Sequence, residues 1–197
     1  FSRADFWRIV LPLVVSHAAY QALQGLWLGP WLTDVAHLER GAAANMLLAT
    51  VFAYTLGSIF FGIAGDQLAR IGLSRMTVYK LGLTTALASF AGIWLDVQTG
   101  RLAIILVYGF SVISAALAYA LLAPRFPLEM TGRVVTASNL LMFGASFACQ
   151  WGIGAVLKQY PVVEGHYSPE GYSVALGTLA VAQIVVLAWL WPMKEEQ

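Results

Sequence analysis

Charged residues are scarce in this sequence of 197 residues. Asp, Glu, Lys and Arg make up 11% of the chain, against about 25% in an ordinary soluble domain. Hydrophobic residues make up 59%, so a soluble domain of this size would have too little polar surface to cover itself. The composition therefore predicts an integral membrane protein, whose first partner is the lipid bilayer.

Two further scarcities narrow the classes of function. The net charge is only +1, so the chain has no basic surface for a nucleic-acid partner. Cys149 is the single cysteine, which excludes an intrachain disulfide and a multi-cysteine metal site. The sequence opens with FSRADFW rather than with an initiator Met, and we expect it to be a piece of a longer polypeptide.

Six apolar stretches are long enough to cross a bilayer as helices, which takes about 20 residues. They are Phe6–Leu28, Ala42–Ile63, Met76–Leu95, Leu102–Ala123, Val134–Leu157 and Val174–Trp191. Membrane-spanning strands are shorter, about 9–11 residues, and alternate in polarity. The sequence predicts an all-α polytopic membrane protein with six transmembrane helices.

Lysine and arginine are distributed unequally between the two sides of these helices. One side has Arg3, Arg8, Arg70, Arg75, Lys80, Arg125, Arg133 and Lys194, and the other has only Arg40, Arg101 and Lys158. Basic residues favour the cytoplasmic side of a membrane. We therefore expect both termini in the cytoplasm, with the protein in an inner (plasma) membrane of bacterial type.

The segment GIAGDQLARIGLSR, Gly62–Arg75, joins the second and third predicted helices on the cytoplasmic side. Gly62 and Asp66 are one helical turn apart, and Asp66 is spaced to pair with Arg70 four residues on or to face the positive end of a neighbouring helix. One interpretation is a basic turn with glycine breakers. The other is a carboxylate latch that a rocking motion of two helical bundles breaks and remakes.

This segment resembles motif A of the major facilitator superfamily, which is Gly-x-x-x-Asp followed by a turn rich in Gly and Arg. Gly62, Asp66, Gly72 and Arg75 match in kind, whereas Gln67 stands where the motif normally has a basic residue. The stretches YQALQGLWLGPWLTDV and FPLEMTGRVVTASNLLMFGASFACQWGIG are similar to the seventh and eleventh helices of bacterial members.

The resemblance covers essentially the whole chain and implies an architecture. Residues 1–197 would form one domain, the C-terminal six-helix half of a twelve-helix transporter, built from two inverted three-helix repeats. Its partner would be the missing N-terminal half, or a second copy if the chain is complete. The first, second, fourth and fifth helices would face a central cavity, and the implied function is secondary transport of a small solute by alternating access.

Polar side chains inside the predicted helices are the candidates for a solute pathway. His17 lies near the middle of the first helix, where an ionisable group is a functional candidate by default. The candidates are His17, Tyr20, Gln21, Gln24, Tyr108, Ser111, Asn139, Phe143 and Gln150. Helix–helix hydrogen bonds and close packing of small residues are the alternative explanation for each of them. A proton carried by His17 is a further hypothesis.

Charged residues near the ends of the helices have simpler interpretations. Glu129 and Arg133 are spaced for a local ion pair, with a gate contact to the missing half as the alternative. The acidic and histidine residues of the outer connections are expected to be solvated, and they lack dense metal-ligand spacing. These residues are Asp34, His37, Glu39, Glu164, His166 and Glu170.

Other classes of membrane protein lack their motifs here. The sequence has no Gly-x-Ser-Gly of an intramembrane serine protease, no paired Asn-Pro-Ala of an aquaporin and no phosphate-binding loop of an ATP-driven pump. We therefore expect neither an enzyme nor a cofactor. The surviving alternative to a transporter is a non-transporting six-helix membrane scaffold, or a signalling or assembly partner.

Overall fold

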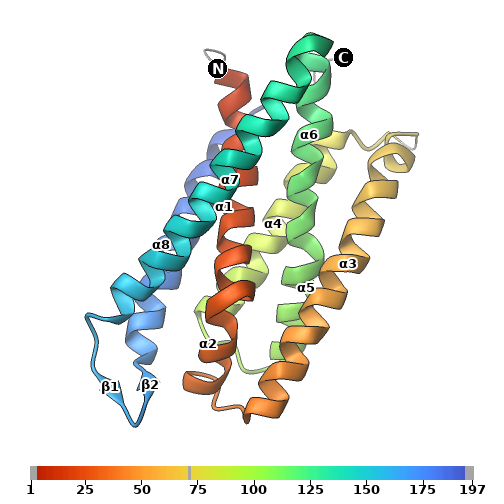
Figure 1. The fold of residues 1–197 in the computed structure, drawn as a ribbon. Helices are drawn as coiled ribbons and strands as arrows, with labels where there is room; N and C mark the ends of the chain where they lie inside the picture. The colour runs from red at the N-terminus through yellow and green to blue at the C-terminus, as the bar shows by residue number, and fades with distance from the viewer. Residues whose placement is uncertain (1–3, 71, 194–197) are drawn as a thin grey trace.

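The computed structural model describes residues 4–70 and 72–193, apart from the side chains of residues 64–66, 69 and 70. These residues form a bundle of long helices (Figure 1). In order they are α1 (Ala4–Ala22), a π-helical turn (Leu23–Trp27), α2 (Leu28–Asp34), α3 (Arg40–Arg70), α4 (Arg75–Trp94), α5 (Arg101–Val112), α6 (Leu117–Leu122), α7 (Leu128–Leu157) and α8 (Pro169–Leu190). Short 3-10 turns, Ile113–Ala116 and Ala123–Arg125, follow α5 and α6.

Five helical segments of the described residues are long and apolar enough to cross a membrane. They are Ala4–Asp34, Arg40–Ile63, Arg101–Arg125, Leu128–Leu157 and Pro169–Leu190. The prediction of an all-helical protein is confirmed, but six spans were predicted and α4 falls short. Arg75, Lys80 and a pair of threonines make α4 more polar, although Thr84 and Thr85 donate their hydroxyl hydrogens to carbonyls of their own helix.

Two predicted boundaries are wrong, because helices continue through residues that usually break them. The first helix was expected to end at Leu28, before Gly29 and Pro30, yet α2 runs on to Asp34. Proline is tolerated near the start of a helical segment because its fixed φ suits the helix, and α2 begins just two residues earlier. The segment after Ile63, expected as a loop, is helical as far as Arg70.

The helices are arranged around α1, which packs against α7, α8, α4 and α5. On the far side of α5 lies α3, so α3 and α7 form the two sides of one face, with α1 and α5–α6 between them (Figure 1). Both ends of the chain lie at the same end of the bundle. A small β-hairpin, β1 (Val162–Val163) and β2 (His166–Tyr167), stands at the opposite end.

Close packing of small residues holds α3 and α4 against α5. A Cβ atom on Gly57 of α3 would lie 2.2 Å from the carbonyl oxygen of Phe110, and one on Gly82 of α4 would lie 2.3 Å from Ser114. Real Cβ atoms do not approach other atoms so closely. Glycine is therefore required at both positions, as is common where membrane helices cross.

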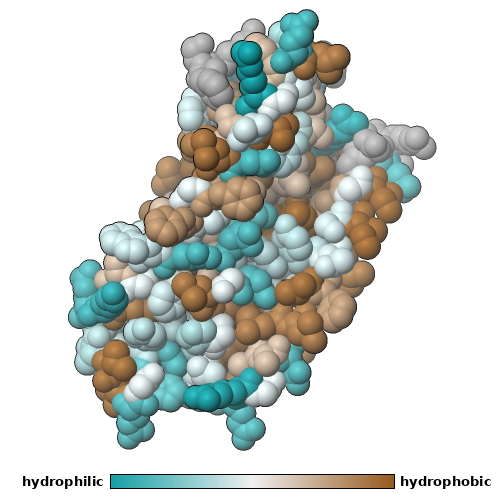
Figure 2. All heavy atoms as spheres, viewed as in Figure 1, coloured by the Kyte–Doolittle hydropathy of each residue, from teal (hydrophilic) through white to brown (hydrophobic). Residues whose placement is uncertain are grey.

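Large apolar side chains remain exposed along α3 and α7. On α3 they include Leu48, Phe52, Leu56 and Ile59, and on α7 Leu140, Phe143, Phe147 and Trp151. Figure 2 shows hydrophobic residues along these two margins and more hydrophilic ones between them. Apolar patches of this extent are typical of surfaces that meet lipid or another protein, which agrees with an integral membrane protein.

Candidate functional site

Four aromatic side chains meet on the face between α3 and α7, and we call them the aromatic cluster. They are His17 and Tyr20 of α1, Tyr54 of α3 and Tyr108 of α5. Tyr20 stacks on Tyr54 with ring centroids 4.8 Å apart and an interplanar angle of 9°. The His17 ring lies 6.4 Å from Tyr20 and 6.5 Å from Tyr54, and Tyr108 lies 5.8 Å from Tyr20.

Helix length places this cluster deep in the bundle. Tyr20 lies fourteen residues before Asp34, the end of α2, and Tyr54 lies fourteen residues after Arg40, the start of α3. At 1.5 Å per residue both lie about 21 Å from the hairpin end of the bundle. A hydrocarbon core is about 30 Å thick, so a membrane that begins near the hairpin end would contain the cluster within its apolar part.

The polar atoms of the aromatic cluster are not satisfied by the rest of the described chain. Neither the His17 ring nor the hydroxyls of Tyr20 and Tyr54 make a hydrogen bond to a described residue. The Tyr108 hydroxyl is buried without a partner in the same part of the chain. His17 and Tyr54 are half-buried, and Tyr20 and Tyr108 lie beneath them. Buried polar groups normally have hydrogen-bond partners, so the Tyr108 hydroxyl is an exception, while the half-buried rings of His17 and Tyr54 leave their polar atoms accessible from the face between α3 and α7.

A second polar group lies nearer the hairpin end, around the π-helical turn. The Gln150 amide nitrogen donates to the Gln21 carbonyl at 3.3 Å, and the Trp27 indole donates to the Gln150 carbonyl at 2.9 Å. Gln24 donates to the Leu47 carbonyl of α3 at 3.1 Å, while its side-chain oxygen is buried with no partner among the described residues. These bonds tie α1 to α3 and α7 where the helix widens, and π-turns are frequent at functional sites.

Two other predicted pathway residues of α7, Asn139 and Phe143, lie apart from the aromatic cluster. Asn139 accepts a hydrogen bond of 2.5 Å from the hydroxyl of Tyr119 on α6. Tyr119 lies eighteen residues after Arg101 and Asn139 eighteen before Leu157, so both lie about 27 Å from the hairpin end. Phe143 is 61% exposed and makes no contact with the aromatic cluster.

Ser111 is placed differently from the other candidates. Its hydroxyl donates to the Val107 carbonyl at 2.6 Å, and the side chain is buried inside the bundle. Ser114 is also buried, against Gly82 of α4. Both serines therefore pack helices together in this structure. For Ser111 this is the alternative explanation given above.

The motif A-like residues are only partly described. The side chains of Asp66 and Arg70 lie outside the described residues, so their pairing stays a prediction. Gly62 faces open space, Gly72 has a φ of +88° that favours glycine, and Arg75 begins α4. Gly62 and Arg75 help to line a cavity of about 400 Å³ between α3, α4 and α6. This end of α3 is therefore open to a neighbouring element.

The expected ion pair between Glu129 and Arg133 is absent. Both side chains are exposed in the first turns of α7, and among the described residues the ion pairs are Arg101–Asp96 and His166–Asp34. Two long exposed side chains gain little from pairing in water, so helical spacing alone does not hold them together.

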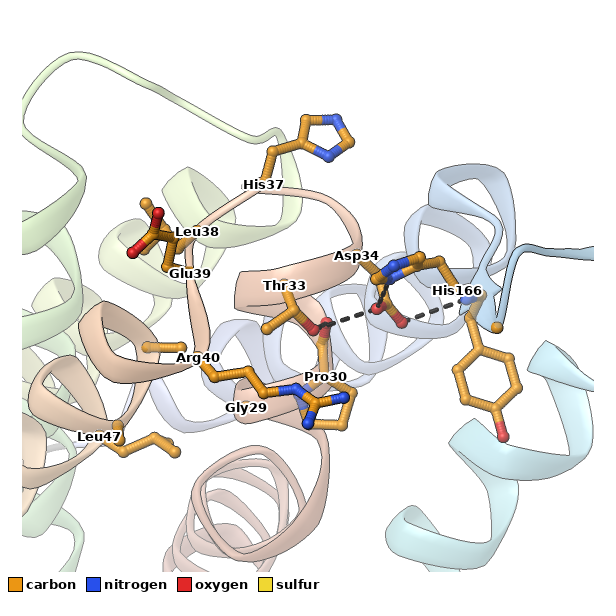
Figure 3. A pocket seen from close by; sticks show the side chains of 14 residues that line it. Gly29, Pro30, Thr33, Asp34, His37, Leu38, Glu39, Arg40, Leu47 and His166 are labelled. Carbon is orange, nitrogen blue, oxygen red and sulfur yellow. Dashed lines mark hydrogen bonds and ion pairs between the residues drawn. The ribbon is translucent and has the colours of Figure 1, made fainter.

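Asp34 was expected to be solvated, and that interpretation is wrong. It is 8% exposed and accepts hydrogen bonds from the Tyr172 hydroxyl at 3.1 Å and the Tyr167 amide at 3.2 Å. The Nδ1 atom of His166 lies 2.7 Å from its carboxylate (Figure 3). Asp34 thus fastens the β-hairpin and the start of α8 to the end of α2.

This fastening borders a hollow at the hairpin end of the bundle. The cavity, of about 810 Å³, is lined from α2, the start of α3 and the hairpin, with Arg40 pointing across it (Figure 3). The signal that would have revealed Asp34 is its place in PWLTDV, where apolar residues surround a single carboxylate. A carboxylate in such a run is buried only if it has partners, and these come from residues more than 130 positions away.

Comparison of the sequence with known proteins identifies no relative of this chain. No protein-family model matches the chain, and no curated protein matches its sequence. The major facilitator resemblance therefore stands on the motif A-like segment and the two helix sequences alone.

Proposed function

We propose that this chain is one half of a secondary transporter and moves a small solute across a membrane by alternating access. The single observation that supports this proposal best is the aromatic cluster, whose polar atoms have no partner in the described chain although they lie deep among apolar helices. Such groups are costly in lipid. A water-filled solute pathway would satisfy them.

The arrangement of the helices supports the same proposal. In the transporter, α3 and α7 would meet the corresponding helices of a second six-helix bundle, which would cover their exposed apolar side chains. The polar residues of α1 and α5–α6 would then line the space between the bundles. In this proposal α4 also spans the membrane, shielded by α5 and α8, and the segment from Gly62 to Arg75 is the cytoplasmic latch.

Cysteine labelling tests the pathway without knowledge of the solute. In a Cys149→Ser background, Tyr54→Cys is treated with a membrane-impermeant thiol reagent from each side of sealed vesicles. Alternating access predicts reaction from both sides. Phe52→Cys is the matched control, since Phe52 lies two residues away on α3 with 62% of its surface exposed. In this proposal the apolar surface of the second bundle covers it, so it should not react from either side.

The alternative function, a non-transporting scaffold, predicts a different result. A dry helix–helix contact would leave Tyr54→Cys unreactive from either side, and that outcome would contradict the transporter proposal. The intact mass of the natural polypeptide is a companion measurement. A mass near twice 21.3 kDa would mean that the natural polypeptide contains the second bundle. A mass near 21.3 kDa would mean that a transporter needs two copies of this chain.

A further inference from the structure

The middle of every helix that borders the aromatic cluster is free of charge. The sequence has no Asp, Glu, Lys or Arg between Arg8 and Asp34, between Arg40 and Asp66, between Arg101 and Arg125, or between Arg133 and Lys158. These intervals contain the middle of α1, α3, α5–α6 and α7. A charged solute at this depth would lose part of its hydration and meet no fixed opposite charge on these helices, where His17 is the one side chain that can become cationic, and that loss is costly.

The groups that the chain does offer are flat rings and neutral hydrogen-bonding atoms. The half-buried rings of His17 and Tyr54 are the part of the cluster that a solute reaches, and their polar atoms have no partner among the described residues. Tyr20 supports Tyr54 from behind by stacking on it. Ring faces favour stacking with another ring, while a hydroxyl and an imidazole nitrogen favour a partner that both donates and accepts.

Amide groups border the aromatic cluster on both sides along the helices. Gln24 and Gln150 lie about 10–15 Å from the hairpin end, and Asn139, bonded to Tyr119, lies beyond the cluster. The side-chain oxygen of Gln24 is buried beneath that face without a partner among the described residues. A solute that carries hydrogen-bonding groups around the edge of a ring matches this order of rings and amides.

We infer that the solute is uncharged and contains a flat ring with hydroxyl or amide groups at its edge. This inference rests on the proposed function, because it assigns the solute class of the same pathway. It goes beyond that proposal by excluding organic anions and cations as preferred solutes and by placing the ring against Tyr54 and His17.

Two sets of probes with the same ring and different charge test the inference. The first set is nicotinamide, its anionic counterpart nicotinate and the cation made by methylating the ring nitrogen of nicotinamide; the second is uridine and uridine monophosphate. Binding to the full-length protein in detergent is measured by the shift of its thermal unfolding and by quenching of its tryptophan fluorescence. At least one neutral probe should bind about tenfold or more tightly than its charged counterpart, a difference of about 1.4 kcal/mol.

Variants of α3 show where the neutral probe binds. Tyr54→Leu removes the ring and should weaken the neutral probe about tenfold or more, whereas Tyr54→Phe keeps the ring and should retain part of the affinity. Phe52→Leu is the matched control and should bind the probe as the unaltered protein does. Equal loss in both leucine variants would show that the effect is not at the cluster and would overturn the inference.

The outcomes separate this inference from the proposed function. Preference for a charged probe, or no response to either neutral probe, would overturn the inference even if Tyr54→Cys reacts from both sides of the membrane. Neutral-probe binding that depends on Tyr54, together with a cysteine that reacts from one side only, would support the inference and contradict alternating access.

Discussion

Tyr20 of α1 and Tyr54 of α3 stack in parallel, 4.8 Å apart, at the same depth of the bundle. The two residues are 34 positions apart in the chain, with the turn between α2 and α3 midway between them. Equal distances from that turn bring them to one level, and the approach of α3 to α5 beside α1 brings them into contact. The stack therefore reports directly on how α1 and α3 are paired.

Gly57 and Gly144 make a matched pair for testing the packing of α3. Alanine at Gly57 would place a Cβ atom 2.2 Å from the Phe110 carbonyl oxygen, whereas alanine at Gly144 would meet nothing within 4 Å. We expect Gly57→Ala to lower the midpoint of thermal unfolding by several degrees. Gly144→Ala should leave the midpoint unchanged or raise it, because alanine favours a helix over glycine by about 1 kcal/mol. An unchanged unfolding midpoint in Gly57→Ala would mean that α3 and α5 are further apart than in this structure.

Asp34→Asn tests the fastening of the β-hairpin. The change removes the charge that holds His166 and weakens the acceptor of the Tyr172 hydroxyl, so we expect a loss of about 1–3 kcal/mol in the free energy of unfolding. Proteolysis between residues 160 and 168 should become faster. Asp96→Asn is the control, since the Asp96 side chain is 31% exposed against 7% for Asp34, and an ion pair of so exposed a carboxylate is worth about 0–1 kcal/mol. Equal effects of the two variants would contradict a special role for Asp34.

Lys80 fastens the end of α8. Its ammonium group donates to the Trp191 carbonyl at 2.8 Å and also to the Met193 carbonyl, and it lies 5.8 Å from the centre of the Trp191 ring. Cations at helix C-termini stabilise the helix through its dipole. We expect Lys80→Met to cost about 1–3 kcal/mol, measured as a lower unfolding midpoint in detergent. Lys158→Met, at the exposed end of α7, should cost less, because Lys158 contributes its charge to that helix end but donates no side-chain hydrogen bond to a described residue. Equal losses would argue against this cap.

Asp66→Asn tests the latch. If Asp66 pairs with Arg70 and a helix end of the second bundle, removing its charge should slow transport while the protein still inserts into the membrane. Rates are measured as uptake into vesicles, and the amount inserted is measured by immunoblot of the same membranes. Gln67→Asn, at the neighbouring exposed position, is the control. Unchanged uptake in Asp66→Asn would rule out the latch.

The sequence by itself determined that the chain is helical and apolar, and it singled out His17, Tyr20 and Tyr108 of the aromatic cluster but not Tyr54. Spans such as Val134–Leu157 were predictable because hydrophobicity and length are local properties of a segment. Helix ends were less predictable. Gly29, Pro30 and Gly65 are breakers in isolation, yet the backbone of α2 and α3 stays helical through them.

Only the tertiary structure decided which polar residues share a site. Tyr20, Tyr54 and Tyr108 come from three helices, and their meeting depends on how those helices pack. The same packing buried Ser111 against its own helix and gave Asp34 partners from the hairpin and α8. A polar side chain in an apolar helix must find a partner, so the sequence reveals the need, but the partner is chosen by contacts between segments far apart in the chain.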